Sequence, residues 1–177
     1  PRDVASVAVI GAGTMGASIA YSSLSAGLNV TLLDNNSQGL ANGQETIRGL
    51  YKGGVARGRL TAADMEAGLA RLQATQDFEA TADVDLVIEA AFENMAVKQE
   101  IFARLDEICH PRTILATNTS TLDVDKIAAA TKRPENVVGM HFFSPAHIMR
   151  LLEIVRGQKT SPDVIVTALA VSKRLRK

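Results

Sequence analysis

Short apolar runs alternate along this chain with stretches whose apolar positions recur at helical spacing. Six such runs are predicted to be strands, and they cover residues 4–10, 30–33, 86–88, 114–117, 137–141 and 151–155. The first is β-branched and almost wholly apolar, as in a strand buried on both faces. Between the first two runs, Met15, Ile19 and Leu24 form a helical stripe, and Gly27 is placed to end that helix. The pattern predicts strands and helices in turn.

Five further helices are predicted, four of them from capping residues. They begin at Ser37, Thr61, Asn94, Leu122 and Ser161. We expect the pair Gly53-Gly54 to interrupt the first of these helices, and the helix capped by Thr61 to run to Leu72.

The alternation predicts an α/β protein with a Rossmann-type, doubly wound, mostly parallel sheet. Only a short loop separates the last two strands, so we expect them to be antiparallel. At 177 residues the chain is long enough for one domain and short for two, and we expect residues 1–177 to form one dinucleotide-binding domain. Because the chain starts at Pro1 and stops in a basic helix, we expect it to be a fragment of a longer enzyme.

Composition excludes several classes of function. Lys and Arg number 19 and Asp and Glu number 19, so there is no net charge to favour nucleic acid or an anionic membrane. No apolar run approaches the length of a membrane span, and we expect neither a signal peptide nor a metal site. Cys109 is the only cysteine, which fits a reducing compartment. We expect the cytoplasm of a bacterium, with mitochondrial and peroxisomal locations left open.

The segment Gly11-Ala-Gly-Thr-Met-Gly16 follows the first strand and opens the first helix. In such a turn Gly11 permits the tight bend, Gly13 lets the backbone approach a pyrophosphate, and Gly16 allows close packing of the helix. The free N–H groups of the helix start, at Thr14 and Met15, can then meet the phosphates. A tight turn without a ligand is the structural alternative.

Asp34 ends the second predicted strand. A carboxylate at this place can bind both ribose hydroxyls and repels the 2′-phosphate of NADP. The sequence therefore predicts NAD as the cofactor.

His141 and Glu153 fall on the last two predicted strands. If these strands are antiparallel, the carboxylate can bond to one ring nitrogen and fix the tautomer, which leaves the other nitrogen as a general base. A structural histidine beside a solvated glutamate is the alternative. His110 and His147 are read as structural, one at a helix end and one in a loop.

Four more polar residues follow predicted strands, where the carboxyl ends of strands face the ligand crevice. Ser120 could hold a substrate oxygen, although it or Thr121 could equally cap the next helix. Asn118 could line the crevice or stabilise the turn. Glu93 and Lys98, taken alone, read as an ordinary pair on a helix surface.

Together these residues resemble the N-terminal, NAD-binding domain of L-3-hydroxyacyl-CoA dehydrogenases. The resemblance covers essentially the whole chain, and its matching segments are 7–16, 85–93, Asn118-Thr-Ser120, His141-Phe-Phe-Ser-Pro-Ala-His147 and 149–155. The glycine turn is shared by many families, whereas the Asn-Thr-Ser and His-Phe-Phe segments are far more specific. The segment Ser144-Pro-Ala-His147 and residues 122–127 look most like the dehydrogenase part of multifunctional β-oxidation enzymes, which also carry an enoyl-CoA hydratase domain.

The resemblance implies a reaction: oxidation of a 3-hydroxyacyl-CoA to a 3-ketoacyl-CoA, with hydride transfer to NAD. It implies that His141 is the base, that Glu153 orients it, and that Ser120 binds the substrate oxygen. It also places Glu93, Lys98, Asn118 and Ser144 at the NAD site.

The chain departs from the family in two respects, its C-terminal end and the stretch Tyr51–Arg59, which falls where the family places residues that contact CoA. We expect this chain to end before the family's helical C-terminal domain, which completes the substrate pocket, and therefore to bind NADH but to turn over poorly. Lys52 and Arg57 could contact CoA phosphates or be solvated charges. A non-catalytic dinucleotide-binding module and a dehydrogenase of a free hydroxy acid remain alternative functions.

Overall fold

The computed structural model describes residues 1–177 and contains one seven-stranded sheet in the order β3-β2-β1-β4-β5-β6-β7. The strands are β1 (Ser6–Ile10), β2 (Asn29–Leu33), β3 (Leu72–Thr75), β4 (Leu86–Glu89), β5 (Ile114–Thr117), β6 (Val137–Phe142) and β7 (Leu152–Val155). The first six are parallel, and β7 pairs antiparallel with β6 at one edge. The predicted doubly wound sheet and its antiparallel end are therefore confirmed.

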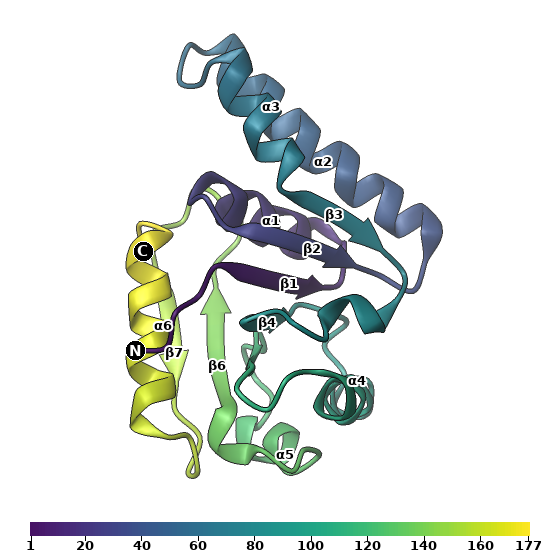
Figure 1. The fold of residues 1–177 in the computed structure, drawn as a ribbon, viewed down its shortest axis with the longest axis vertical. Coiled ribbons are helices and arrows are strands. Elements are labelled where there is room, and N and C mark those ends of the chain that lie inside the picture. The colour runs from purple at the N-terminus through teal and green to yellow at the C-terminus, as the bar shows by residue number, and fades with distance from the viewer.

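Helices cover both faces of this sheet (Figure 1). They are α1 (Thr14–Ser25), α2 (Ser37–Ala56), α3 (Ala62–Ala70), α4 (Met95–Ile108), α5 (Val124–Ala128) and α6 (Pro162–Arg174), with short 3-10 helices η1 (Phe78–Thr81) and η2 (Pro134–Asn136). No helix combines the length and the apolar character that crossing a membrane requires.

Successive side chains of each strand point to opposite faces of the sheet, and each face packs in its own hydrophobic core. Val7 and Val9 of β1 lie in a core of 26 buried residues with α1, α2 and α6. Ala8 and Ile10 lie in a core of 14 buried residues with α4 and α5. Because both faces are buried, the central strands read as continuous apolar runs in the sequence.

The prediction for residues 61–75 was wrong in one respect. Thr61 and Asp64 form the expected capping box, but α3 ends at Ala70, and Leu72 begins the unpredicted strand β3. This edge strand is only partly buried. It is a strand because it pairs with β2, where Leu72 lies opposite Val30, and a pairing between distant segments leaves no local signal.

Gly53 and Gly54 do not interrupt α2, contrary to the prediction. The helix is continuous, and a Cβ at Gly54 would lie 2.7 Å from Cδ1 of Leu60. The glycine therefore lets the following turn fold back against the helix, and packing outweighs its low helix propensity. The helix is capped by Asn36, whose side chain accepts a hydrogen bond from the Gly39 amide, and not by Ser37.

Candidate functional site

The glycine turn between β1 and α1 has the geometry that a phosphate-binding turn needs. Gly11 adopts φ +103°, and a Cβ there would lie 2.7 Å from the carbonyl oxygen of Ala90. A Cβ on Gly16 would lie 1.7 Å from the carbonyl oxygen of Gly11, so the helix can start here only without a side chain. At Gly13 a Cβ would meet nothing within 4 Å, which leaves open space where a ligand can approach the backbone.

Asp34 follows β2 beside this turn. Its Oδ2 accepts a hydrogen bond of 2.8 Å from the Ala12 amide, and its Oδ1 accepts one of 2.9 Å from the Asn36 amide. These bonds hold the carboxylate at the turn. Each carboxylate oxygen can accept a second bond, so the group remains available to ribose hydroxyls.

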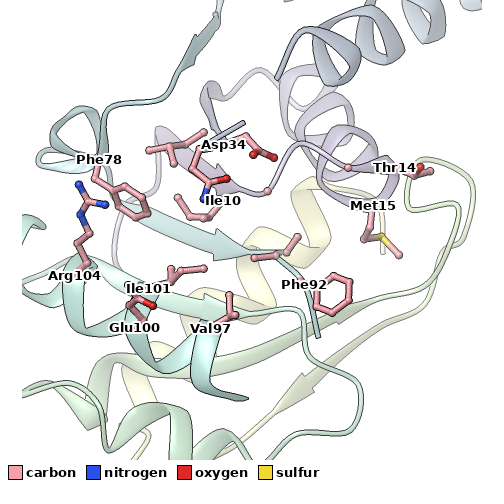
Figure 2. A pocket seen from close by; sticks show the side chains of 16 residues that line it. Ile10, Thr14, Met15, Asp34, Phe78, Phe92, Val97, Glu100, Ile101 and Arg104 are labelled. Atoms are coloured by element: carbon pink, nitrogen blue, oxygen red, sulfur yellow. The ribbon is translucent and has the colours of Figure 1, made fainter. Parts of the chain in front are cut away.

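A pocket of about 680 Å³ opens over the carboxyl ends of the central strands (Figure 2). Five of its lining residues were predicted from the sequence: Gly11, Gly13, Thr14, Met15 and Asp34. Its size is in the range of small-molecule and cofactor sites. The glycine cradle, the carboxylate and the pocket together fit a dinucleotide such as NAD.

The opposite wall of the pocket was missed by sequence reasoning. It includes Phe78, Phe92, Val97, Ile101 and Arg104. In Figure 2, Phe78 and Arg104 lie at one end and Phe92 near Met15 at the other, and the Arg104 guanidinium sits 4.2 Å from the centre of the Phe78 ring. Phe92 is 82% exposed in the structure, and the sequence alone did not show that this apolar residue lies outside the core.

Lys98 is not part of a surface pair, so the interpretation of Glu93 and Lys98 from their spacing alone was wrong. The Lys98 side chain is buried, and its Nζ lies 2.5 Å from Oε2 of Glu89, which is also buried. A second contact of 3.3 Å joins Nζ to Oε1 of Glu93. The sequence concealed this arrangement because Glu89 ends an apolar strand and lies nine residues before Lys98 in the chain.

Glu93 connects the loop after β4 to the loop after β5. Its Oε2 accepts hydrogen bonds of 2.9 Å from the Thr119 hydroxyl and 3.1 Å from the Ser120 amide, and lies 3.4 Å from the Ser120 hydroxyl. Burial raises the pKa of Glu93, but these hydrogen bonds and the charge of Lys98 outweigh it and hold the pKa below its usual value. Glu93 is therefore a carboxylate near neutral pH.

His141 and Glu153 lie opposite each other on β6 and β7. The His141 Nδ1 is 3.0 Å from Oε1 of Glu153, so the predicted contact is present. The His141 side chain is largely buried and that of Glu153 is about half exposed. The carboxylate can thus orient the imidazole and leave Nε2 as the second ring nitrogen.

Asn118 and Ser144 lie outside the pocket, in the loops after β5 and β6. The Asn118 Oδ1 accepts a hydrogen bond of 2.8 Å from the Phe142 amide. This side chain therefore joins the loop after β5 (residues 118–123, the Ser120 loop) to β6, the strand that carries His141. Ser144 is exposed in the loop after β6. Neither residue lines the 680 Å³ pocket, and nor do Glu93, Lys98 and Gly16.

Comparison with known proteins places this arrangement in a family. Residues 6–177 match the family model described as "3-hydroxyacyl-CoA dehydrogenase, NAD binding domain". The chain is 45% identical over 177 residues to a peroxisomal fatty acid beta-oxidation multifunctional protein of Oryza sativa subsp. japonica, covering all of this chain and 24% of the relative. It is 42% identical over 176 residues to the fatty acid oxidation complex subunit alpha of Pseudomonas syringae pv. tomato, covering 99% of this chain and 24% of that protein.

A solved structure agrees with these sequence relatives. The crystal structure of 3-hydroxybutyryl-CoA dehydrogenase from Escherichia coli K12 superposes with a TM-score of 0.97 at 43% identity, covering 99% of this chain and 37% of that one. The chain thus spans about a quarter of the length of the curated relatives it matches. By sequence and by fold, the chain belongs to the family of NAD-binding domains of 3-hydroxyacyl-CoA dehydrogenases.

Proposed function

We propose that this chain is the cofactor-binding and proton-transferring part of an enzyme that oxidises (S)-3-hydroxyacyl-CoA to 3-ketoacyl-CoA in fatty acid β-oxidation. The observation that carries the proposal is the contact of 3.0 Å between His141 and Glu153, near the carboxyl end of β6, because the loops after β4 and β5 begin at the same end of the parallel strands. A non-catalytic dinucleotide-binding module has no use for this pair. We also infer that residues 1–177 form one NAD-binding domain.

In this proposal His141 is the general base. Its Nε2 takes the proton of the substrate 3-hydroxyl as the hydride leaves C3, and Glu153 holds the ring in the matching tautomer and stabilises the imidazolium that forms. The Ser120 hydroxyl donates a hydrogen bond to the substrate oxygen. When bound, NAD supplies the hydride acceptor.

The cofactor is assigned to the glycine turn, including Thr14 and Met15, and to Asp34, which binds the adenine ribose. Glu93, Asn118 and Ser144 serve the nicotinamide half, because they follow β4, β5 and β6 at the same sheet edge. Lys98 does not line the pocket and supports its wall, because its Nζ donates a hydrogen bond of 3.3 Å to the carbonyl oxygen of Ala91, which lines the pocket.

The rest of the substrate site belongs to parts of the native protein beyond this domain. The relatives named multifunctional proteins are about four times as long as the chain, and we propose a helical domain that completes the acyl-CoA pocket and an accompanying enoyl-CoA hydratase. Lys52 and Arg57 on and after α2 are proposed to meet CoA phosphates. A reducing compartment, the cytoplasm in a bacterium, suits the single buried Cys109.

The test compares turnover and cofactor affinity in the native protein that carries this domain. His141→Ala should lower turnover of 3-hydroxybutyryl-CoA by about 10²-fold to 10⁴-fold and leave the Kd for NADH unchanged. His110→Ala, at the opposite end of the sheet, is the matched control and should leave both values unchanged. Equal turnover in His141→Ala and His110→Ala would refute the assigned base.

Substrate choice separates the remaining alternatives. Turnover of 3-hydroxybutyryl-CoA but not of free 3-hydroxybutyrate supports the proposal. Preference for the free acid would identify a hydroxy acid dehydrogenase. NADH binding without turnover of either compound by the native protein would identify a non-catalytic module.

A further inference from the structure

Glu89 is a fully buried carboxylate at the end of β4 to which the reaction above gives no role. Its side chain is 0% exposed, and that of Lys98 is 2% exposed. A buried ion pair is seldom more stabilising than apolar residues of the same volume, because both charges lose their hydration. The pair therefore calls for an explanation other than stability.

Every polar atom of this pair is used. The Lys98 ammonium has three hydrogens, and it has three oxygen partners: Oε2 of Glu89 at 2.5 Å, Oε1 of Glu93 at 3.3 Å and the carbonyl of Ala91 at 3.3 Å. Two of these contacts, those with Glu89 and Ala91, are hydrogen bonds, and the contact with Glu93 is an ion pair. In this arrangement Lys98 joins parts of the protein to one another.

Both carboxylate oxygens of Glu89 also have hydrogen-bond partners. Its Oε2 also accepts a hydrogen bond of 2.8 Å from the Ala91 amide, and its Oε1 accepts one of 2.7 Å from the Thr117 hydroxyl. Ala91 lies in the pocket wall, and Thr117 ends β5 directly before the Ser120 loop. One carboxylate oxygen of Glu89 thus contacts the loop after β4 (residues 90–93), and the other contacts the neighbouring strand β5.

We propose that Glu89 is a positioning residue, which acts through Lys98 and Glu93 to hold the cofactor loop (residues 90–93) and the Ser120 loop in one fixed arrangement. The chain of contacts runs from Glu89 to Lys98, from Lys98 to Glu93, and from Glu93 to the amide of Ser120 at 3.1 Å. A fully satisfied buried network of this kind favours a single geometry. Only the role of Ser120 as a substrate ligand rests on the proposed function.

Removing the charge of Glu89 tests this chain of contacts. In Glu89→Gln, Lys98 keeps one carboxylate partner, Glu93, and should draw it away from Ser120. We expect the Kd for NADH to rise about tenfold, which corresponds to ~1.4 kcal/mol. We also expect faster hydrogen exchange at the Ser120 amide, measured by NMR on this chain of 18.8 kDa.

The matched control is Asp106→Asn. Asp106 pairs with Arg133 at 2.7 Å, and both side chains are nearly buried, at 12% and 10% exposed, but the pair lies between α4 and the residues after α5, away from both loops. This variant should lower the melting temperature while leaving the Kd for NADH and the Ser120 amide unchanged. If Glu89→Gln behaves in the same way, the pair is merely structural and the proposal is overturned.

A second variant covers the case in which Glu89→Gln does not fold. Glu89→Asp keeps the negative charge and withdraws the carboxylate by one methylene, so both readouts should shift in the same direction by a smaller amount. No shift in either readout would overturn the proposal. Neither measurement needs turnover, so a failure of the proposed dehydrogenase activity cannot be mistaken for a failure of this inference.

Discussion

The imidazole Nδ1 of His141 lies 3.0 Å from Oε1 of Glu153, and the two residues are register partners across the one antiparallel strand pair of the sheet. Register partners project to the same face. The contact is therefore built into the pairing of β6 with β7, and a one-residue slip would separate the two side chains.

Removing the charge of Glu153 should impair proton transfer without impairing cofactor binding. Glu153→Gln retains the shape of the side chain but can donate its amide N–H to Nδ1 and so favour the wrong tautomer. We expect kcat of the native protein to fall about 10²-fold, measured as NADH formation. The Kd for NADH is the internal control. An unchanged kcat would contradict the orienting role of Glu153.

Asp34 should control the choice between NAD and NADP. Asp34→Asn removes the charge that repels a 2′-phosphate, so the ratio of the Kd values for NADPH and NADH should fall roughly tenfold. Fluorescence titration of the 177-residue chain with each nucleotide measures this ratio. Asp77→Asn, at the cap of η1 and outside the pocket lining, should leave it unchanged. A ratio that stays constant in Asp34→Asn would show that another residue selects the cofactor.

Two glycines of the same turn should respond differently to alanine. In Gly16→Ala the new Cβ would lie 1.7 Å from the Gly11 carbonyl oxygen, so the free energy of unfolding should fall by about 3 kcal/mol. In Gly13→Ala the Cβ meets nothing and φ is −69°, so stability should hardly change while NADH binding weakens. Urea unfolding and NADH titration of both variants make the comparison. Equal loss of stability in the two variants would contradict it.

Glu93 should make the stability of the protein depend on pH in the acid range. Its pKa in the folded protein is lowered from 4.5, in spite of its burial, by hydrogen bonds from Thr119 and Ser120 and by the Lys98 charge. A lowered pKa adds stability above the unfolded-state value, and this stability is lost as the pH falls through the folded-state value. The stability difference between the wild-type chain and Glu93→Gln should therefore be greatest above about pH 5 and shrink below pH 4.5. A difference that grows on acidification would show the sign to be wrong.

Phe92 should matter for the cofactor and not for folding. The residue is 82% exposed, and its side chain lies at the pocket near Met15 (Figure 2). Phe92→Ser should leave the melting temperature unchanged and raise the Kd for NADH several-fold, because an apolar contact over the ligand is lost. Leu169→Ser on α6, at a residue 49% exposed and outside the pocket, should change neither value. If the two variants bind NADH equally well, Phe92 does not cover the ligand.

Features with a local cause were predictable from the sequence. The buried strands β1, β4 and β5 appear as apolar runs, and the caps at Thr61 and Asn94 form as expected. The glycine turn is recognisable because each glycine answers a steric need within a few residues. The pairing of His141 with Glu153 followed from the shortness of the loop between their strands, which permits only an antiparallel hairpin.

Features that depend on distant partners were not predictable. Strand β3 exists through its pairing with β2, and α2 continues through Gly53 and Gly54 because Leu60 folds back against it. Lys98 looked like a surface cation, since nothing in its own helix showed that Glu89 would lie beneath it. The far wall of the pocket, with Phe78 and Arg104, was hidden for the same reason.

The sequence by itself thus determined the order of the elements, the phosphate-binding turn, Asp34 and the segments that identify the family, because these depend on short-range sterics and spacing. The tertiary structure alone decided which charges are buried, how Glu93 joins the cofactor loop to Ser120, and what forms the second wall of the pocket. The physical reason is that burial and ion pairing arise between side chains that the sheet brings together from distant parts of the chain. The energy of a buried charge depends on the atoms packed around it and not on its neighbours in the sequence.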